Sequence, residues 1–152
     1  MNYKKFDKLD FKKIHPAGSL GAQLKTVEDI MVTGEKIPFV DENLMINDAL
    51  KTLSNKKLGI LIIQDKNKKT KGIVTDGQIR RVNLKKINFN LLPVKKIMTT
   101  KPMSIEKDEL AAKALSIMNE KKITSLAVHN KRDKFKTIGI IHIHHILQSK
   151  IT

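Results

Sequence analysis

The residues with the clearest chemical potential form the segment Thr75-Asp76-Gly77-Gln78-Ile79-Arg80-Arg81, which follows Gly72 and two aliphatic residues. The aliphatic residues favour a β-strand, and Thr75 is a good N-cap for a helix that starts after it. Backbone N–H groups at a helix start have no partner inside the helix, so they can bind an anion. We expect Thr75, Gln78 and Arg80 to contact a negatively charged ligand. The alternative is that Thr75 acts only as the helix cap.

A second junction of the same kind begins at Gly139, as the first does at Gly72, and it carries three histidines. His142 and His144 would share one face of a strand, which suggests a metal site. No carboxylate lies close in the sequence, however, and a turn from strand to helix would separate His145 from the other two. We therefore predict no metal and no cofactor. We expect His142 to take the place of Thr75, and His145 that of Gln78, on the other side of a ligand cleft.

These two junctions belong to a longer internal repeat. Val27-Glu28-Asp29-Ile30-Met31 corresponds to Val94-Lys95-Lys96-Ile97-Met98, at the same spacing as Gly72 and Gly139. Ala49-Leu50 corresponds to Ala114-Leu115 at a slightly shorter spacing, and a small change of offset is what loops of different length produce. Two diverged copies of one supersecondary unit are therefore expected to close against each other as a pair.

Each copy reads as strand, helix, strand, strand, helix, so the predicted fold class is α+β with two β-α-β-β-α repeats related by a pseudo-two-fold axis. Apolar residues at helical spacing predict helices over residues 44–55 and 110–120. Continuous aliphatic runs predict buried strands at 60–63 and 125–128. Loops are expected at 65–69 and 130–136, helices at 79–86 and up to 149, and a linker at 89–93. The predicted divisions are residues 1–26, a first repeat at 27–88 and a second repeat at 94–150.

Composition excludes several classes of protein. The 152 residues are 40% hydrophobic and contain no cysteine, so a disulfide framework or a thiolate metal site is impossible. The net charge of +15 comes from 27 lysines and only three arginines, spread along the whole chain, and aromatic residues make up 4%. That pattern indicates a solvated lysine-rich surface rather than a nucleic-acid platform. No apolar run approaches the length of a membrane span and no signal peptide is recognisable, so we expect a cytoplasmic protein without nucleic-acid or membrane partners.

The two-copy plan, its Gly-aliphatic-aliphatic-Thr junction and its two aliphatic-Met segments resemble a tandem pair of CBS (cystathionine-β-synthase) domains over about residues 27–150. The segment His15-Pro16-Ala17-Gly18-Ser19-Leu20-Gly21, followed by Val-Glu-Asp-Ile-Met, is similar to the connection between the two halves of the arabinose-5-phosphate isomerase family. Thr-Asp-Gly-Gln-Ile-Arg-Arg and Gly-Ile-Ile-His-Ile-His-His resemble the two junctions of those enzymes.

The resemblance implies a regulatory module of a sugar-phosphate isomerase. Those enzymes interconvert ribulose 5-phosphate and arabinose 5-phosphate in the synthesis of Kdo, an acidic sugar of bacterial lipopolysaccharide, and their catalytic part is an N-terminal sugar-isomerase domain that has no counterpart in this sequence. His15 resembles a histidine that reaches their catalytic pocket, and an imidazole suits proton transfer near neutral pH. Without the sugar-phosphate domain it is expected to be an ordinary loop histidine, so the chain itself is predicted to be inactive. Residues 1–26 would be the end of the catalytic domain and its connection, and a stand-alone gene product is the alternative.

The resemblance also implies a ligand. In CBS pairs the hydroxyl at the position of Thr75 commonly contacts a phosphate or ribose, and an Asp three residues later holds the ribose hydroxyls. Gln78 and His145 stand at that position here, so adenosine nucleotides are expected to bind weakly. The expected ligand is another anionic nucleotide or a sugar nucleotide, and the pathway makes CMP-Kdo a sensible feedback signal. We further expect a homo-oligomer through the CBS helices; a purely structural dimerisation module with an empty cleft is the competing reading.

Overall fold

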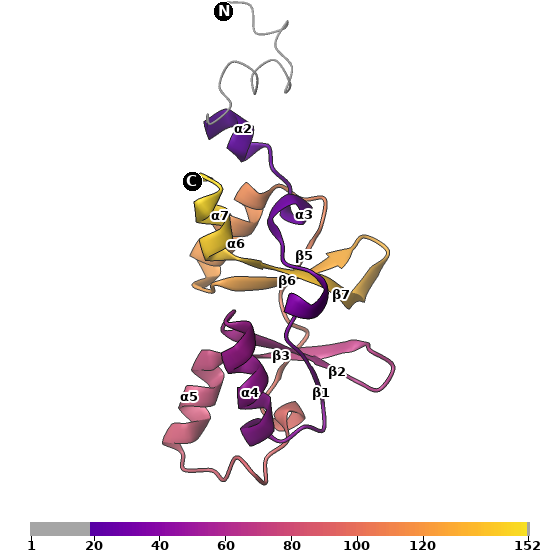
Figure 1. Cartoon of the computed structure of the whole chain (residues 1–152), viewed down its shortest axis with the longest axis vertical. Coiled ribbons are helices and arrows are strands. Elements are labelled where there is room, and N and C mark those ends of the chain that lie inside the picture. The colour runs from indigo at the N-terminus through magenta and orange to yellow at the C-terminus, as the bar shows by residue number, and fades with distance from the viewer. Residues whose placement is uncertain (1–18, 152) are drawn as a thin grey trace, which may run out of the picture.

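The computed structural model describes residues 19–151, so His15 and its predicted catalytic role lie outside the described residues. The chain folds into two α+β units, each with its own sheet (Figure 1). The helices are α2 (Ser19–Gln23), α3 (Val27–Ile30), α4 (Ile46–Lys56), α5 (Asp76–Leu84), α6 (Ala111–Lys121) and α7 (Ile143–Gln148), with short 3-10 turns at Gly34–Lys36 and Val94–Lys96. The strands are β1 (Phe39–Asp41), β2 (Ile60–Gln64), β3 (Thr70–Thr75), β4 (Thr99–Thr100), β5 (Ser104–Glu106), β6 (Ser125–Asn130) and β7 (Asp133–His142).

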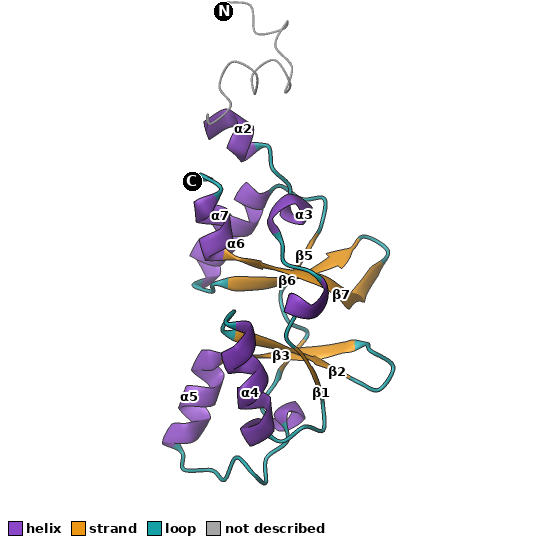
Figure 2. Cartoon of the chain, in the orientation of Figure 1, coloured by secondary structure: helices purple, strands orange, loops and turns teal. Residues whose placement is uncertain are grey.

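Three strands of each sheet have the same topology, which confirms the tandem repeat, and the first sheet carries a fourth strand. The first has the order β1-β2-β3-β4 and the second the order β5-β6-β7. In each sheet the short first strand is parallel to its neighbour, and the next two strands form an antiparallel hairpin. Figure 2 shows α4 and α5 on the outer face of one sheet and α6 and α7 on the outer face of the other, so the two sheets face each other in the middle of the molecule.

Three apolar clusters follow from this layering. One lies between the first sheet and its helices, where Ile46, Ala49 and Leu53 of α4 form the predicted buried stripe. A second cluster lies between the other sheet and α6 and α7. The third joins the inner faces of the two sheets and includes Ile62 and Ile140, both fully buried. Strand β2 is buried on both faces, as its continuous aliphatic run predicts.

The repeats exchange their first segments, which their order in the sequence does not reveal. Val27 is fully buried in the cluster of the second repeat, and Val32 pairs with Ile140 of β7. Conversely, Val94 is fully buried in the cluster of the first repeat, and β4 pairs with β3. The sequence divisions 27–88 and 94–150 therefore differ from the two packed units, because each unit takes its leading segment from the other copy.

A pseudo-two-fold axis relates the two units. The hydroxyl groups of Thr70 and Thr137 lie 2.8 Å apart, and these residues are 67 positions apart in the sequence. At the other end of the interface the Ser125 hydroxyl donates to the Leu58 carbonyl oxygen at 3.3 Å, which joins the two units through residues at different positions of the repeat. The threonine pair joins residues that the repeat makes equivalent, so the internal repeat of the sequence is also the symmetry of the fold.

Some local predictions need correction. The segment that ends at Gly21 is helical from Ser19. Helix α5 begins at Asp76, directly after the predicted N-cap Thr75. Strand β7 begins at Asp133, so the expected loop over residues 130–136 is a tight hairpin. The linker at 89–93 packs on the first unit, since the N–H of Ile46 donates to the Leu92 carbonyl oxygen at 2.8 Å.

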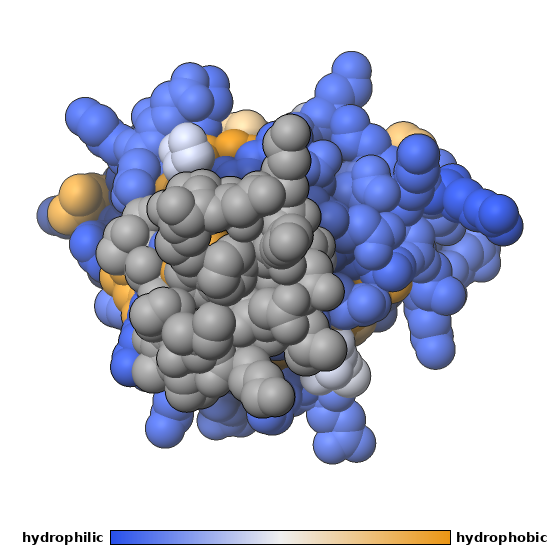
Figure 3. Space-filling model, turned by 90° about the horizontal axis from the view of Figure 1, so that it is seen from above, coloured by the Kyte–Doolittle hydropathy of each residue, from blue (hydrophilic) through white to orange (hydrophobic). Residues whose placement is uncertain are grey.

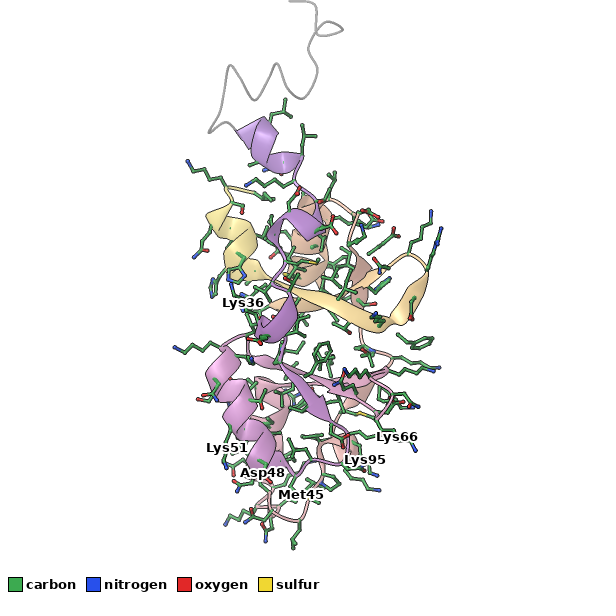
Figure 4. All side chains as sticks on the ribbon, turned by 45° about the vertical axis from the view of Figure 1, so that its right-hand side comes forward. Lys36, Met45, Asp48, Lys51, Lys66 and Lys95 are labelled. Atoms are coloured by element: carbon green, nitrogen blue, oxygen red, sulfur yellow. The ribbon has the colours of Figure 1, made fainter. Side chains whose placement is uncertain are left out.

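The end of the molecule where α2 lies is mostly polar. Figure 3 shows hydrophilic side chains there, with a few isolated apolar patches around the grey atoms. Figure 4 shows Lys36 near the middle of the molecule, and Lys51, Lys66 and Lys95 in the lower unit. Among residues 19–151 no helix has the length and apolar content needed to cross a bilayer.

Candidate functional site

A cleft of about 1200 Å³ lies between the two units and brings the two sequence junctions together. Thr75 and Gln78 line it from the first junction, and His142 lines it from the second. Leu58 and Ser125, which form a hydrogen bond between the units at this end of the interface, also line it. The cleft is therefore shared by both repeats, and its size is ample for a nucleotide-sized ligand.

Thr75 lies at the end of β3 and caps α5. Its hydroxyl accepts a hydrogen bond from the Gln78 N–H at 3.3 Å, and the Gln78 side-chain oxygen accepts from the Thr75 N–H at 2.8 Å. This reciprocal capping box satisfies two N–H groups at the start of the helix. The structure thus shows the capping role of Thr75, while its half-buried side chain still lines the cleft.

The side chain of Gln78 is fully engaged within the protein. Its amide nitrogen donates to the Ile97 carbonyl oxygen at 3.1 Å and to the Thr99 hydroxyl oxygen at 3.0 Å. Its oxygen is held by Thr75. A primary amide has two N–H donors, and both have partners here. Gln78 therefore ties α5 to the exchanged segment, and a ribose would have to compete with those contacts.

At the second junction, His142 occupies the N-cap position of α7. Its Nδ1 accepts a hydrogen bond from the His144 N–H at 3.1 Å. Burial, followed by the neighbouring charges of His144 and His145, lowers the pKa of His142. An uncharged imidazole at neutral pH keeps Nδ1 free to accept this bond, so the lowered pKa is consistent with the capping role.

The three histidines lie closer together than expected. The ring centroids of His142 and His144 are 5.0 Å apart, and those of His142 and His145 are 5.9 Å apart, so the turn does not splay them. His144 lies in α7 and not on a strand face. Within residues 19–151 no group of three or more potential ligands has an arrangement suited to a metal ion.

Three cations outside the expected set of ligand contacts also line the cleft: Lys57, Arg81 and Lys122. Arg81 follows Gln78 by three positions, so both lie on one helix face. Its Nη1 is 3.5 Å from the place where a β-carbon on Gly77 would stand, which puts the guanidinium over the helix start. Lys57 and Lys122 are the C-cap residues of α4 and α6, and both have left-handed backbone. They occupy equivalent positions of the internal repeat, and this equivalence was the feature of the sequence that could have identified them.

Two predicted ligand residues lie elsewhere. Arg80 is outside the cleft lining; its side chain is 74% exposed and stands 3.9 Å from Asp76, one turn back on the same helix. His145 is also outside the lining, and its buried Nδ1 has no hydrogen-bond partner among the described residues. Of the predicted contacts, the structure brings together Thr75, Gln78 and His142, and it adds Arg81 to them.

The sequence matches the CBS domain family twice, over residues 27–85 and 94–151. The chain belongs to the CBS domain family. Its two CBS domains form a tandem pair, as the solved structures of similar CBS proteins also indicate.

Curated relatives of this CBS pair include sugar-phosphate isomerases. The chain is 35% identical over 147 residues to arabinose 5-phosphate isomerase KdsD of Yersinia pestis, covering 96% of this chain and 44% of that protein. It is 36% identical over 143 residues to KdsD of Escherichia coli K12, covering 93% and 43%. The chain thus spans less than half the length of these relatives.

Among solved structures, the CBS pair is similar to CBSX2 in complex with AMP, with a TM-score of 0.71 and 25% identity, covering 82% of this chain and 95% of that one. It is also similar to a putative signal-transduction protein with CBS domains from Burkholderia ambifaria, with a TM-score of 0.67 and 29% identity, covering 76% and 82%.

Proposed function

We propose that this CBS pair is the ligand-sensing, regulatory module of an arabinose-5-phosphate isomerase, and that it binds an anionic nucleotide or sugar nucleotide in the cleft between its repeats. The observation that carries the proposal is the lining of the cleft: Lys57, Arg81 and Lys122 line it together with Thr75, against a single carboxylate, Asp76. Three cations that line one cleft favour a phosphate-bearing ligand.

The isomerase part of the proposal is supported by the similarity to KdsD, which covers nearly the whole of this chain. In that setting the module responds to a product of the pathway, and CMP-Kdo has the required chemistry, with a phosphate and an acidic sugar. The interconversion of ribulose 5-phosphate and arabinose 5-phosphate belongs to a catalytic domain, so the CBS pair by itself is expected to be inactive. A cytoplasmic location remains a prediction.

Adenosine nucleotides are the natural comparison, because the CBSX2 structure holds AMP. In this chain the residue expected to hold a ribose is the neutral Gln78, and its amide already bonds Ile97 and Thr99. A ligand that needs a charge-assisted bond at that point loses it here. We therefore propose that AMP and ATP bind weakly in this first cleft, and that a ligand that relies on its cations binds there more tightly.

Self-association through the helices is part of the same proposal. Leu84 of α5 is 78% exposed and Leu147 of α7 is 48% exposed, and apolar side chains of this kind gain stability when a second copy covers them. The competing proposal, a dimerisation module with an empty cleft, rests on the same exposed residues. Light scattering over a concentration series measures the association, and it does not distinguish the two readings.

Ligand binding does distinguish them. The thermal stability of the chain would be measured with AMP, ATP, CMP and CMP-Kdo at constant ionic strength. A ligand that binds only the folded state stabilises it by about 2.7 kcal/mol at a hundredfold excess over its dissociation constant. Stabilisation by CMP-Kdo that Thr75→Val reduces would support the sensing module. No stabilisation by any of the four ligands would favour the structural module.

A further inference from the structure

A second cleft, of about 510 Å³, lies at the other end of the interface between the two sheets. Its walls come from the β2–β3 hairpin, the segment from Met98 to Ser104, and the β6–β7 hairpin. Thr70 and Thr137, which share the hydrogen bond at this end of the pseudo-two-fold axis, line it, and the Thr137 side chain is buried. None of the junction residues from Thr75 to Gln78 reaches it.

Four lysines from three separate segments line this second cleft: Lys69, Lys71, Lys101 and Lys134. No carboxylate is among the lining residues, and none of the four lysines forms an ion pair within the described part of the chain. The carboxylate of Asp65, on the same hairpin, accepts backbone N–H bonds from Asn67 and Lys69 at 2.9 and 3.0 Å and shapes the turn. Asp65, outside the lining, is close enough to interact with the charges of Lys71 and Lys69. The lining itself still carries a net positive charge.

The cleft also has an apolar wall. Phe135 is 56% exposed, and the Lys69 ammonium group lies 4.6 Å from the centre of its ring. Met98, Pro102 and Ala127 continue that wall. A flat aromatic group can pack against such a surface, and an adjacent cation can interact with its π-system.

His129 provides a neutral polar group in the same cleft. Burial first, and then the charge of Lys134, lowers its pKa, against the opposing effect of Glu106 on the neighbouring strand. Its buried Nδ1 has no hydrogen-bond partner among residues 19–151. The imidazole is thus uncharged near neutral pH, and the positive charge of the cleft comes from its lysines.

From these features we infer that the second cleft is a separate binding site for a small molecule that carries an aromatic ring and two or more phosphate groups, such as a nucleoside triphosphate. The four lysines would hold the phosphates, for which mobile ammonium groups are well suited, and the ring would pack on Phe135. The volume lies within the range of small-molecule sites. This site is independent of the proposed function of the first cleft, since Pro102 is the one residue that lines both.

The test uses the full chain, titrated with ATP and with inorganic triphosphate at constant ionic strength and followed by NMR at each backbone amide. The double variant Lys71→Gln/Lys134→Gln removes two charges that line the cleft. The control, Lys66→Gln/Lys136→Gln, removes two charges from the same hairpins outside the lining; Lys66 is labelled in Figure 4. A third variant, Phe135→Ala, removes the aromatic wall.

We expect both probes to shift amides of the β6–β7 hairpin and of Thr70, with ATP binding more tightly. The Lys71→Gln/Lys134→Gln variant should weaken binding roughly tenfold or more, whereas the control should change it by less than about twofold. Phe135→Ala should remove the difference in affinity between ATP and triphosphate.

Equal weakening by the control pair, or shifts confined to residues 75–81 and 142–145, would overturn the inference. ATP binding no more tightly than triphosphate would overturn the aromatic part of the site. Failure of CMP-Kdo to bind the first cleft would leave these results unaffected.

Discussion

Gly72 of β3 lies so close to Thr99 of β4 that a β-carbon on the glycine would stand 2.5 Å from the Thr99 carbonyl oxygen. The equivalent Gly139 of β7 lies as close to the exchanged segment at Met31 and Val32. Because neither glycine has a side chain, each leaves room for a backbone segment from the other copy. The exchange of segments between the repeats depends on these two close approaches.

The first prediction follows from that contact. Gly72→Ala should lower the free energy of unfolding by about 1–3 kcal/mol, because the obstructing atom is a backbone oxygen that cannot rotate away. Gly77→Ala is the matched control: a β-carbon there meets nothing closer than 3.5 Å, and alanine in α5 should stabilise the helix by up to about 1 kcal/mol. Urea denaturation measures both. Equal stability of the Gly72→Ala and wild-type chains would show that β4 does not pack as described.

A pair of valines tests the exchange itself. Val27→Ala and Val94→Ala each remove two methyl groups from a fully buried site, at equivalent positions of the two repeats. Val27 packs in the second unit, so its truncation should increase hydrogen exchange in β6, β7 and α6. Val94→Ala should increase it in β2, β3 and α4. Each truncation is expected to cost about 2 kcal/mol. The exchange of segments would be refuted if Val27→Ala increased hydrogen exchange in β2 and β3, and Val94→Ala increased it in β6 and β7.

The hydroxyl pair on the axis gives a third prediction. Thr70→Val leaves the buried Thr137 hydroxyl without its partner, which should cost about 1–2 kcal/mol of unfolding free energy. The double variant Thr70→Val/Thr137→Val should cost less than the sum of the two single variants, since no hydroxyl is then left unpaired. A thermodynamic cycle from urea denaturation measures the coupling. Strict additivity would mean that the two hydroxyls do not interact.

The lowered pKa values of His129 and His142 predict a pH dependence of stability. In the unfolded chain these histidines titrate near the ordinary pKa of 6.5, whereas the folded chain holds them neutral to lower pH. The unfolded state therefore binds more protons below about pH 6.5, so the free energy of unfolding should fall as the pH drops from 7.5 to 5.5.

The control for this dependence is the double variant His129→Gln/His142→Asn, which replaces both imidazoles by neutral groups and keeps an N-cap at α7. Its urea midpoint should change less between pH 7.5 and 5.5 than that of the wild-type chain. An unchanged slope would assign the pH dependence to other groups.

Local patterns were enough to predict the longer helices and the buried strands. The spacing of Ile46, Ala49 and Leu53 predicted α4, and the aliphatic run from Ile60 predicted β2. The exchange of Val27 could not be predicted in the same way, because a repeat shows which segments are equivalent and not which copy each segment packs against. A contact between segments distant in the sequence leaves no trace in local periodicity.

The candidate site was predictable only in part, for similar reasons. The junction pattern located Thr75 and His142 at the cleft. The choice between Arg80 and Arg81 depends on the rotation of α5 against the sheet, which the sequence does not specify. The engagement of Gln78 with Ile97 and Thr99 depends on partners 19 and 21 residues away. Whether a side chain is available to a ligand is therefore decided by the tertiary structure.

The central claim is that the cleft between the repeats binds an anionic ligand through the cations that line it. Calorimetric titration of CMP-Kdo into the wild-type chain and into Arg81→Gln and Arg80→Gln variants tests it most directly, because these neighbouring arginines differ in their relation to the cleft. Loss of a charge-assisted hydrogen bond in Arg81→Gln should weaken binding roughly tenfold, while Arg80→Gln should change it by less than about twofold. Absence of binding to the wild-type chain, or equal weakening by the two substitutions, would contradict the account.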